Sequence, residues 1–444
     1  MSGSTSVVAF SLNPPAVTEL DASEALPPWI LLETRVYFDQ RDNYTAASTT
    51  TSRDQHEITV SICLADPPAL SYVCLRCPSL STNNFVGEPR VLRSEKQLLL
   101  LHLPLTWSTS GVLKRSNEYY MYQVIQGKPK LSRIPDPNPP SLLLPDDLGI
   151  YCAADAPGEY ILAGLCLTRD AQAHELHLYS SKSNAWTMKP ARLENPKFEP
   201  RLPVTPHKVI PLGGSLIGWV DLWNGILVCD VLSSRRRQVL LRFIPFPERL
   251  PGNTSDHLCP WKVRDVTCAN GSLKFIEIEH YPDPNDDLDT KPLSIFGWRS
   301  VIWNRVLSDN CWRLGCNVGF HDILVENPSP PSALLAGDAA GDSKTIDLLP
   351  SFPNLSIHRD DVVHAKCLVR LDVLKSHMVS IDMRSKALKA LVPCTAVKLD
   401  AYCPHFPCVL SNHLSNTPGI ECNNLMNKEM VPLQKKRIEP GVGV

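Results

Sequence analysis

Residues 218–232 read GWVDLWNGILVCDVL, two apolar runs on either side of an Asn-Gly pair. The first run begins in SLIGWVD and the second continues as GILVCDVL, and both have the apolar content of strands. Asn224-Gly225 is the dipeptide that most readily adopts the positive φ angles of a tight hairpin turn. The stretch therefore predicts a β-hairpin over residues 215–232.

The polar and aromatic residues of this hairpin are expected to serve the fold. The carboxylate of Asp221 is placed to accept a hydrogen bond from the backbone N–H two residues on, which stabilises a turn. Trp219 and Trp223 lie four residues apart and share a strand face if the strand runs that far. We therefore assign Trp219, Asp221, Trp223, Asn224 and Gly225 to the hairpin structure, and predict no catalytic, cofactor-binding or metal-binding role for them.

Similar strand–turn–strand units recur along the chain, with alternating apolar and polar residues. They are found at 174–190, 207–247, 263–281, 300–315 and 365–393. Units of about 40 to 60 residues, each with four short strands, are typical of propeller blades. The sequence predicts a mainly β protein, a degenerate β-propeller-like repeat of four-stranded meanders. The alternative is two separate β domains.

The predicted organisation has four parts. Residues 1–26 form a disordered N-terminus, 27–140 an N-terminal β region, 148–414 a C-terminal β region that contains the hairpin, and 415–444 a flexible tail. Turn-rich segments at 45–55 and 132–147 are interpreted as loops or linkers, and 326–343 as an insertion.

Composition limits the classes of function. The 444 residues are 43% hydrophobic and 20% charged, with a formal net charge of −2, which disfavours a nucleic-acid-binding surface. The first thirty residues contain no Lys or Arg, unlike a secretory signal or a transit peptide, and no run reaches the roughly 18 apolar residues of a membrane helix. The 15 cysteines lie in apolar runs and are expected to be buried free thiols. We expect a location in the cytosol or nucleus and no contact with membranes.

The hairpin stretch, together with PPWILLETRVYF (27–38) and FPCVLSNHL (406–414), resembles a plant family that is greatly expanded in cereal grasses. The family is defined only as domain-of-unknown-function family 1618, so the resemblance implies no activity, no catalytic residue and no cofactor. The rhythm of the chain is also similar to the β-rich regions that follow F-boxes in plant ubiquitin-ligase receptors. Residues 25–40 lack the helical apolar spacing of an F-box, which argues against one here.

Two loop motifs depart from the ligand sites that they resemble. In GDAAGDSKT (337–345) the glycines have the wrong spacing for a phosphate loop, and Asp342 places negative charge where phosphate would lie. In DPNDDLDTKPLS (283–294) acidic and amide residues alternate as in a calcium loop, but Leu288 and Ser294 occupy the required glycine and glutamate positions. We predict that both are solvated loops.

Metal-ligating residue types occur in three places. Cys63, Cys74 and Cys77 form one group, and a second contains Cys403, His405, Cys408, His413 and Cys422. Neither has the two close pairs of a structural zinc site, so we predict a packed segment and leave metal binding by the second group open. In HELH, strand alternation sends His174 and His177 to opposite faces, which excludes a site made by the two histidines together.

These observations favour a non-enzymatic scaffold for protein–protein interaction, with binding residues on rim loops such as 283–290. The alternative is a hydrolase or sugar-binding enzyme whose polar residues converge in the central channel. A second alternative is a nucleic-acid-linked regulator. The short basic runs at 233–238 and 434–437 are interpreted as a solvated turn and a flexible tail, with a nuclear-import or acidic-partner role as the alternative. No cofactor is predicted, and the protein partners and any small-molecule ligand are unknown.

Overall fold

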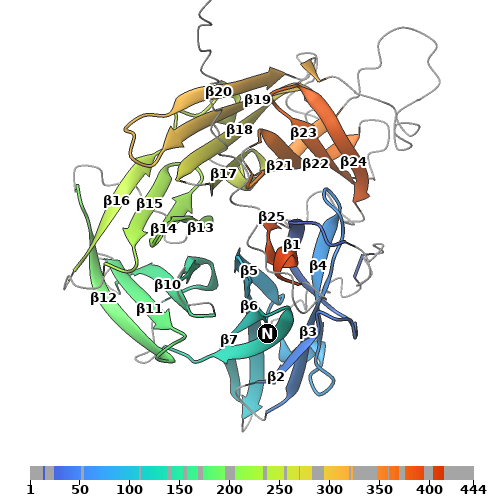
Figure 1. Ribbon diagram of the computed structural model, residues 1–444, viewed down its shortest axis with the longest axis vertical. Coiled ribbons are helices and arrows are strands. Elements are labelled where there is room, and N and C mark those ends of the chain that lie inside the picture. Colours follow the sequence, from blue (N-terminus) through green and yellow to red (C-terminus); the bar gives the residue numbers. More distant parts are fainter. Residues whose placement is uncertain are drawn as a thin grey trace, which may run out of the picture.

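Six β-meanders surround a central axis in the part of the chain that the computed structural model describes (Figure 1). The described residues are 14–15, 25–51, 55–109, 112–137, 143–153, 158–168, 174–195, 206–233, 238–254, 258–269, 271–282, 295–319, 322–323, 348–358, 360–369, 376–394 and 404–414. The loop 283–290, the insertion 326–343, the tail 415–444 and nearly all of the predicted N-terminal segment 1–26 lie outside them.

Five meanders each consist of four strands that are consecutive in the sequence and antiparallel to their neighbours. The first meander consists of β5 (Arg90–Glu95), β6 (Leu98–Thr109), β7 (Val112–Ile125) and β8 (Lys128–Ile134). The second consists of β9 (Leu148–Cys152), β10 (Tyr160–Leu167), β11 (His174–Ser180) and β12 (Ala185–Leu193). The third is β13 (Lys208–Gly213), β14 (Leu216–Asp221), β15 (Gly225–Asp230) and β16 (Val239–Pro245). The fourth consists of β17 (Arg264–Ala269), β18 (Ser272–Pro282), β19 (Ile295–Val306) and β20 (Arg313–Gly319). The fifth consists of β21 (Leu348–Leu355), β22 (Val362–Val369), β23 (Ser376–Asp382) and β24 (Ala387–Cys394).

The sixth unit, which we call the sixth meander although its strands β1 and β4 are parallel, joins the two ends of the described chain. Its strands are, from the axis outward, β25 (His405–Cys408), β1 (Ile30–Phe38), β4 (Leu70–Arg76), β3 (Glu57–Cys63) and β2 (Ala47–Thr50). β25 pairs with β1 in antiparallel register, with Ile30 opposite Cys408, and Figure 1 shows the two strands side by side. A strand from the C-terminal end thus completes a sheet that the N-terminal strands begin.

The first strand of each meander faces the axis and contacts the first strand of the next. These contacts run from β5 to β9, β13, β17 and β21, then to β25, and return to β5 through β1. The outer strands β12 and β16 also pair in parallel, with Ala191 opposite Val239. The prediction of a mainly β, propeller-like repeat of four-stranded meanders is confirmed.

The hydrophobic core lies between neighbouring meanders, because alternate strand residues face opposite sides of each sheet. Val220 and Ile226 of the third meander pack against Val266 and Phe275 of the next. The Phe275 ring also stacks on Phe246, with ring centroids 4.3 Å apart. Full burial of such side chains stabilises the fold by about 1.5–3 kcal/mol each.

The hairpin of β14 and β15 has a different turn from the one expected. Three residues, Leu222 to Asn224, separate the strands, and the N–H of Asn224 donates to the carbonyl oxygen of Asp221 over 3.1 Å. We predicted a turn centred on Asn224-Gly225, but Gly225 is the first residue of β15. The Asp221 carboxylate accepts the N–H of Trp223 over 2.9 Å, the contact that the sequence predicts, and this bond stabilises the three-residue turn. Trp223 therefore lies in the turn and does not share a strand face with Trp219.

Helices are short in the described part of the chain. They are the 3₁₀ segments η1 (Thr82–Asn84), η2 (Pro145–Asp147), η3 (Pro251–Asn253), η4 (Pro260–Lys262) and η7 (Leu410–His413). None of the described helices has the length and apolar character needed to cross a bilayer.

Candidate binding cavity on the ring axis

A cavity of about 590 Å³ lies on the axis, enclosed by the inner strands. Its wall is formed by β5, β9, β13, β17 and β25, with Thr34 of β1, part of β14, and Ile357, which follows β21. Segments that are more than 300 residues apart in the sequence therefore meet at one site, as Glu95 and Phe406 do. This convergence is a direct consequence of the ring.

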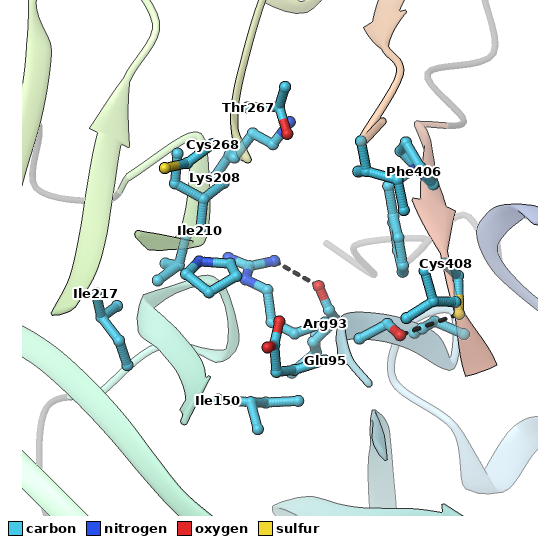
Figure 2. A pocket seen from close by; sticks show the side chains of 18 of the residues that line it. Arg93, Glu95, Ile150, Lys208, Ile210, Ile217, Thr267, Cys268, Phe406 and Cys408 are labelled. Carbon is cyan, nitrogen blue, oxygen red and sulfur yellow. Dashed lines mark hydrogen bonds between the residues drawn. The ribbon is translucent and has the colours of Figure 1, made fainter. Parts of the chain in front are cut away.

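The wall combines apolar side chains with a few charged ones. In Figure 2, Ile210 and Ile217 lie on one side of the space and Phe406 on the other, while Arg93 and Glu95 project between them. Arg93 and Glu95 occupy alternate positions on β5, which gives their side chains the same face of the strand. An apolar wall with a few placed polar groups is typical of ligand sites.

Glu95 is the most perturbed acid in the cavity wall. Burial raises the pKa of its carboxyl to about 7, and the neighbouring ammonium of Lys96 offsets only part of that effect. At neutral pH the carboxyl is therefore present in both the protonated and the ionised form. It can donate a hydrogen bond to a ligand or accept one.

Lys208 and Asp265 fix three inner strands to one another. The Lys208 ammonium on β13 lies 2.6 Å from one carboxylate oxygen of Asp265 on β17. The second oxygen of Asp265 accepts the N–H of Leu355 on β21 over 2.9 Å. Both charged side chains are well buried, and the pair connects β13, β17 and β21 beside the wall.

A second set of polar contacts joins β5 to the segment before β9. The Arg90 guanidinium lies 3.3 Å from the Asp146 carboxylate, and both side chains are partly exposed. Arg93 donates to the carbonyl oxygens of Leu92 and Asp146 over 2.6 Å each. The two arginines thus attach one end of the cavity wall to η2.

The cysteines of the wall are not activated as nucleophiles. The Cys408 thiol lies 3.0 Å from the Ser94 hydroxyl, and burial raises its pKa to about 11. The Cys152 thiol donates to the carbonyl oxygen of Glu95, and burial raises its pKa to about 12. Both remain protonated at neutral pH, whereas a nucleophilic cysteine needs a lowered pKa.

The structure separates the described members of the second metal-ligating group. His405 opens β25, with its Nε2 atom 3.1 Å from the Asn354 side-chain nitrogen, whereas Cys408 ends the strand against Ser94. His413 ends η7, and Cys403 and Cys422 lie outside the described residues.

The first cysteine group is also divided. Cys63 and Cys74 have sulfur atoms 4.0 Å apart and are buried together with Tyr37 and Tyr72. Cys77 belongs to the core of the sixth meander instead. The prediction of packed segments matches these positions, and metal binding by the C-terminal group stays open.

The five hairpin residues singled out in the sequence do not line the cavity, although Leu216 and Ile217 of the same hairpin do. The Trp219 indole N–H donates to the carbonyl oxygen of Asp147 over 2.7 Å, which connects β14 to η2. The Trp223 ring lies between two guanidinium groups, 4.3 Å from Arg249 and 4.6 Å from Arg264. The structural role that we predicted for these residues stays a prediction that stability measurements can test.

Sequence reasoning identified none of the charged residues of the cavity wall. Arg93 and Glu95 belong to the ordinary strand sequence RVLRSE, which contains no recognised motif. Their position in the repeat could have identified them. The first strand of each meander faces the axis, so the polar residues of that strand are candidates for the cavity wall.

Residues 219–364 match the family model described as protein of unknown function (DUF1618). The DUF1618 match begins at Trp219 within β14 and ends at His364, so it covers most of the hairpin, β16, the meander of β17 to β20, and the start of the next meander. It includes the wall residues Trp261, Thr267, Cys268 and Ile357 but not those of β5, β9, β13 or β25. No curated protein matches the chain. The family description supplies no activity, so function must be inferred from the cavity.

Proposed function

We propose that this chain is a non-enzymatic interaction scaffold whose axial cavity receives a short segment of a partner protein. The cavity carries the proposal, because its volume of about 590 Å³ lies within the range of about 300–1,000 Å³ that ligand sites occupy. Its wall offers apolar surface from Ile210, Ile217 and Phe406, and hydrogen-bonding groups from Glu95 and Thr267. A peptide presents both kinds of surface.

The charges of the wall favour such a segment over a polyanion. The wall contains four Lys or Arg side chains and the two acids Glu95 and Asp146. Lys208 pairs with Asp265, Arg90 lies against Asp146, Arg93 donates to backbone carbonyl oxygens, and Lys96 is exposed. Nucleic acid binding depends on clustered cations that replace counterions on phosphates. The mixed wall and the net charge of −2 therefore support a protein ligand.

The proposal places the protein in the cytosol or nucleus of a cereal grass, as the family resemblance implies. The described cysteines are free thiols, which supports a reducing compartment.

Affinity purification with a variant that fills the cavity tests this proposal. Thr267→Phe places an aromatic ring in the wall at a half-buried position of β17. Lys182→Glu in the turn between β11 and β12 is the control, because its side chain is 75% exposed and does not line the cavity. We expect partners that co-purify with the wild type and with Lys182→Glu to be lost with Thr267→Phe. Partners retained by all three proteins would exclude the cavity as the binding site.

A hydrolase is the second candidate, and the Glu95 carboxyl supports it. A carboxyl with a pKa of about 7 in a cavity suits a general acid, and Asp146 provides a second carboxyl group in the same wall. A screen of glycoside and ester substrates with the wild type and Glu95→Gln tests this candidate. Turnover that is lost in Glu95→Gln would support it, and a wild type without turnover would reject it.

A further inference from the structure

A cysteine, a glutamate and a histidine meet on one face of the meander formed by β9 to β12. Cys166 lies near the end of β10, and the register places it directly opposite Glu175 on β11. His177 follows two residues later on β11, so its side chain projects to the same face as that of Glu175. One ligand atom from each of the three residues lies within 4.8 Å of the others.

The environment of His177 suggests a missing ligand. Its side chain is 6% exposed, and its buried Nε2 atom makes no hydrogen bond. The nearest carboxylate oxygen, Oε2 of Glu175, lies 3.4 Å away. A buried polar atom without a partner costs about 1–3 kcal/mol, so such atoms are rare unless another group satisfies them.

The spacing of these atoms fits two ligands of one metal ion. Zinc binds nitrogen and oxygen ligands at about 2.0–2.2 Å in tetrahedral geometry, which places neighbouring ligand atoms about 3.5 Å apart. The 3.4 Å between His177 Nε2 and Glu175 Oε2 is close to that value. The Cys166 sulfur needs only a small inward adjustment, since all three atoms already lie within 4.8 Å of one another.

We propose that Cys166, Glu175 and His177 bind a zinc ion. A thiolate, an imidazole and a carboxylate together suit zinc, whereas magnesium and calcium prefer oxygen ligands alone. Three protein ligands leave the fourth tetrahedral position for water or a ligand. Binding releases the proton of the Cys166 thiol to solvent as the zinc–sulfur bond forms, and no oxidant or reductant is needed.

The strand geometry explains why the HELH motif did not reveal this site. The prediction that His174 and His177 cannot form a joint site holds in the register, because the two residues occupy opposite-facing positions of β11. The other members of the cluster are Glu175, on the same face of β11, and Cys166, which lies opposite Glu175 on the neighbouring strand β10. Spacing along the chain cannot show such a pair.

Cobalt and zinc titrations of the full-length, metal-free protein test the proposal. Cobalt bound by a thiolate gives a charge-transfer band in the near ultraviolet, and competition with a chromophoric chelator gives the zinc affinity. We expect stoichiometric binding and this band in the wild type, and loss of the band in Cys166→Ser. His177→Gln should weaken zinc binding by more than the roughly 10–100-fold that loss of an outer-shell partner causes.

Two variants serve as matched controls. His174→Gln removes a histidine from the opposite face of β11, and Cys229→Ser removes a buried thiol of β15. Both should bind cobalt and zinc as the wild type does. If Cys166→Ser fails to fold by circular dichroism, the partly exposed Glu175→Gln replaces it and should reduce zinc affinity. A wild type that binds no zinc, or a cobalt band that persists without the Cys166 thiol, would overturn the proposal.

Discussion

The guanidinium of Arg264 donates to the carboxylate of Glu277 over 2.7 Å, and both side chains are completely buried. Arg264 also donates to the carbonyl oxygen of Leu222 over 3.0 Å, in the turn of the β14–β15 hairpin. The other Glu277 oxygen accepts hydrogen bonds from the Asn253 side chain and the Leu250 backbone. One ion pair thus connects the hairpin turn, the segment around η3 and the first two strands of the next meander.

Breaking this ion pair should destabilise the protein strongly. Arg264→Met leaves the Glu277 carboxylate buried without its cation, and the expected loss is about 3–5 kcal/mol of unfolding free energy, measured by urea denaturation. Arg313→Met is the control, since Arg313 is 74% exposed and its pair with Asp309 is expected to contribute at most about 1 kcal/mol. Equal losses in the two variants would show that the buried pair does not hold the meanders together.

Gly225 should tolerate no larger residue. A Cβ atom there would overlap the Ile244 carbonyl oxygen and lie 2.8 Å from the Phe243 ring, and φ is +155°. We expect Gly225→Val to cost more than the about 1–3 kcal/mol of backbone strain alone. Gly271→Val separates the two effects, because φ is +74° there and the added Cβ meets nothing within 4 Å. Thermal unfolding compares the two variants, and a Gly225→Val protein no less stable than Gly271→Val would rule out the steric argument.

His364 should make the fold sensitive to acid. Burial lowers the pKa of its imidazole to about 4, from an ordinary value of 6.5, and Nδ1 lies 2.8 Å from the Ser380 hydroxyl. Asp360 partly offsets this effect, and His358 adds to it. The folded state favours the neutral ring. The contribution of His364 to the unfolding free energy is therefore fully present above pH 6.5 and is lost as the pH falls towards 4. The loss amounts to at most about 3 kcal/mol.

A pair of histidine variants checks this dependence. His358 and His364 both lie against the Trp29 ring, but His358 is exposed. Urea denaturation across the same pH window should give a flatter profile for His364→Asn than for the wild type, whereas His358→Asn should keep the wild-type slope. A His364→Asn profile parallel to that of the wild type would mean that another group is responsible.

The parts of the fold that depend on local pattern could be predicted. Alternation in HELHLYS and the paired apolar runs around Asn224-Gly225 predicted β11 and the hairpin, because one buried face imposes a period of two. The turn was wrong in its register, since three residues separate the strands and Gly225 begins β15. The predicted hydrogen bond from the Trp223 N–H to the Asp221 carboxylate is present. The hydrogen bond spans two residues and is therefore a local feature, whereas the number of residues in the loop also depends on the register of the two strands.

Long-range features could not be predicted in the same way. The pairing of Ile30 with Cys408 joins residues from opposite ends of the described chain, and neither strand has a motif that names its partner. The raised pKa of Glu95 depends on its surroundings in the closed ring, which no local window contains. The cluster of Cys166 with His177 likewise needs the cross-strand register.

The pairing of β25 with β1 leads to the final prediction, made with two truncated chains. A chain that ends at residue 403 lacks β25 and η7, and with them Cys408, Leu410 and Leu414, which are at most 1% exposed in the core of the sixth meander. The two leucines alone contribute about 1.5–3 kcal/mol each, and β1 would also lose its inner partner. A chain that ends at residue 414 keeps these contacts and should unfold at the wild-type urea concentration, whereas the shorter chain should unfold at a lower one. If both truncated chains unfold alike, β25 is not needed to close the ring, and the alternative of two independently folding β regions gains support.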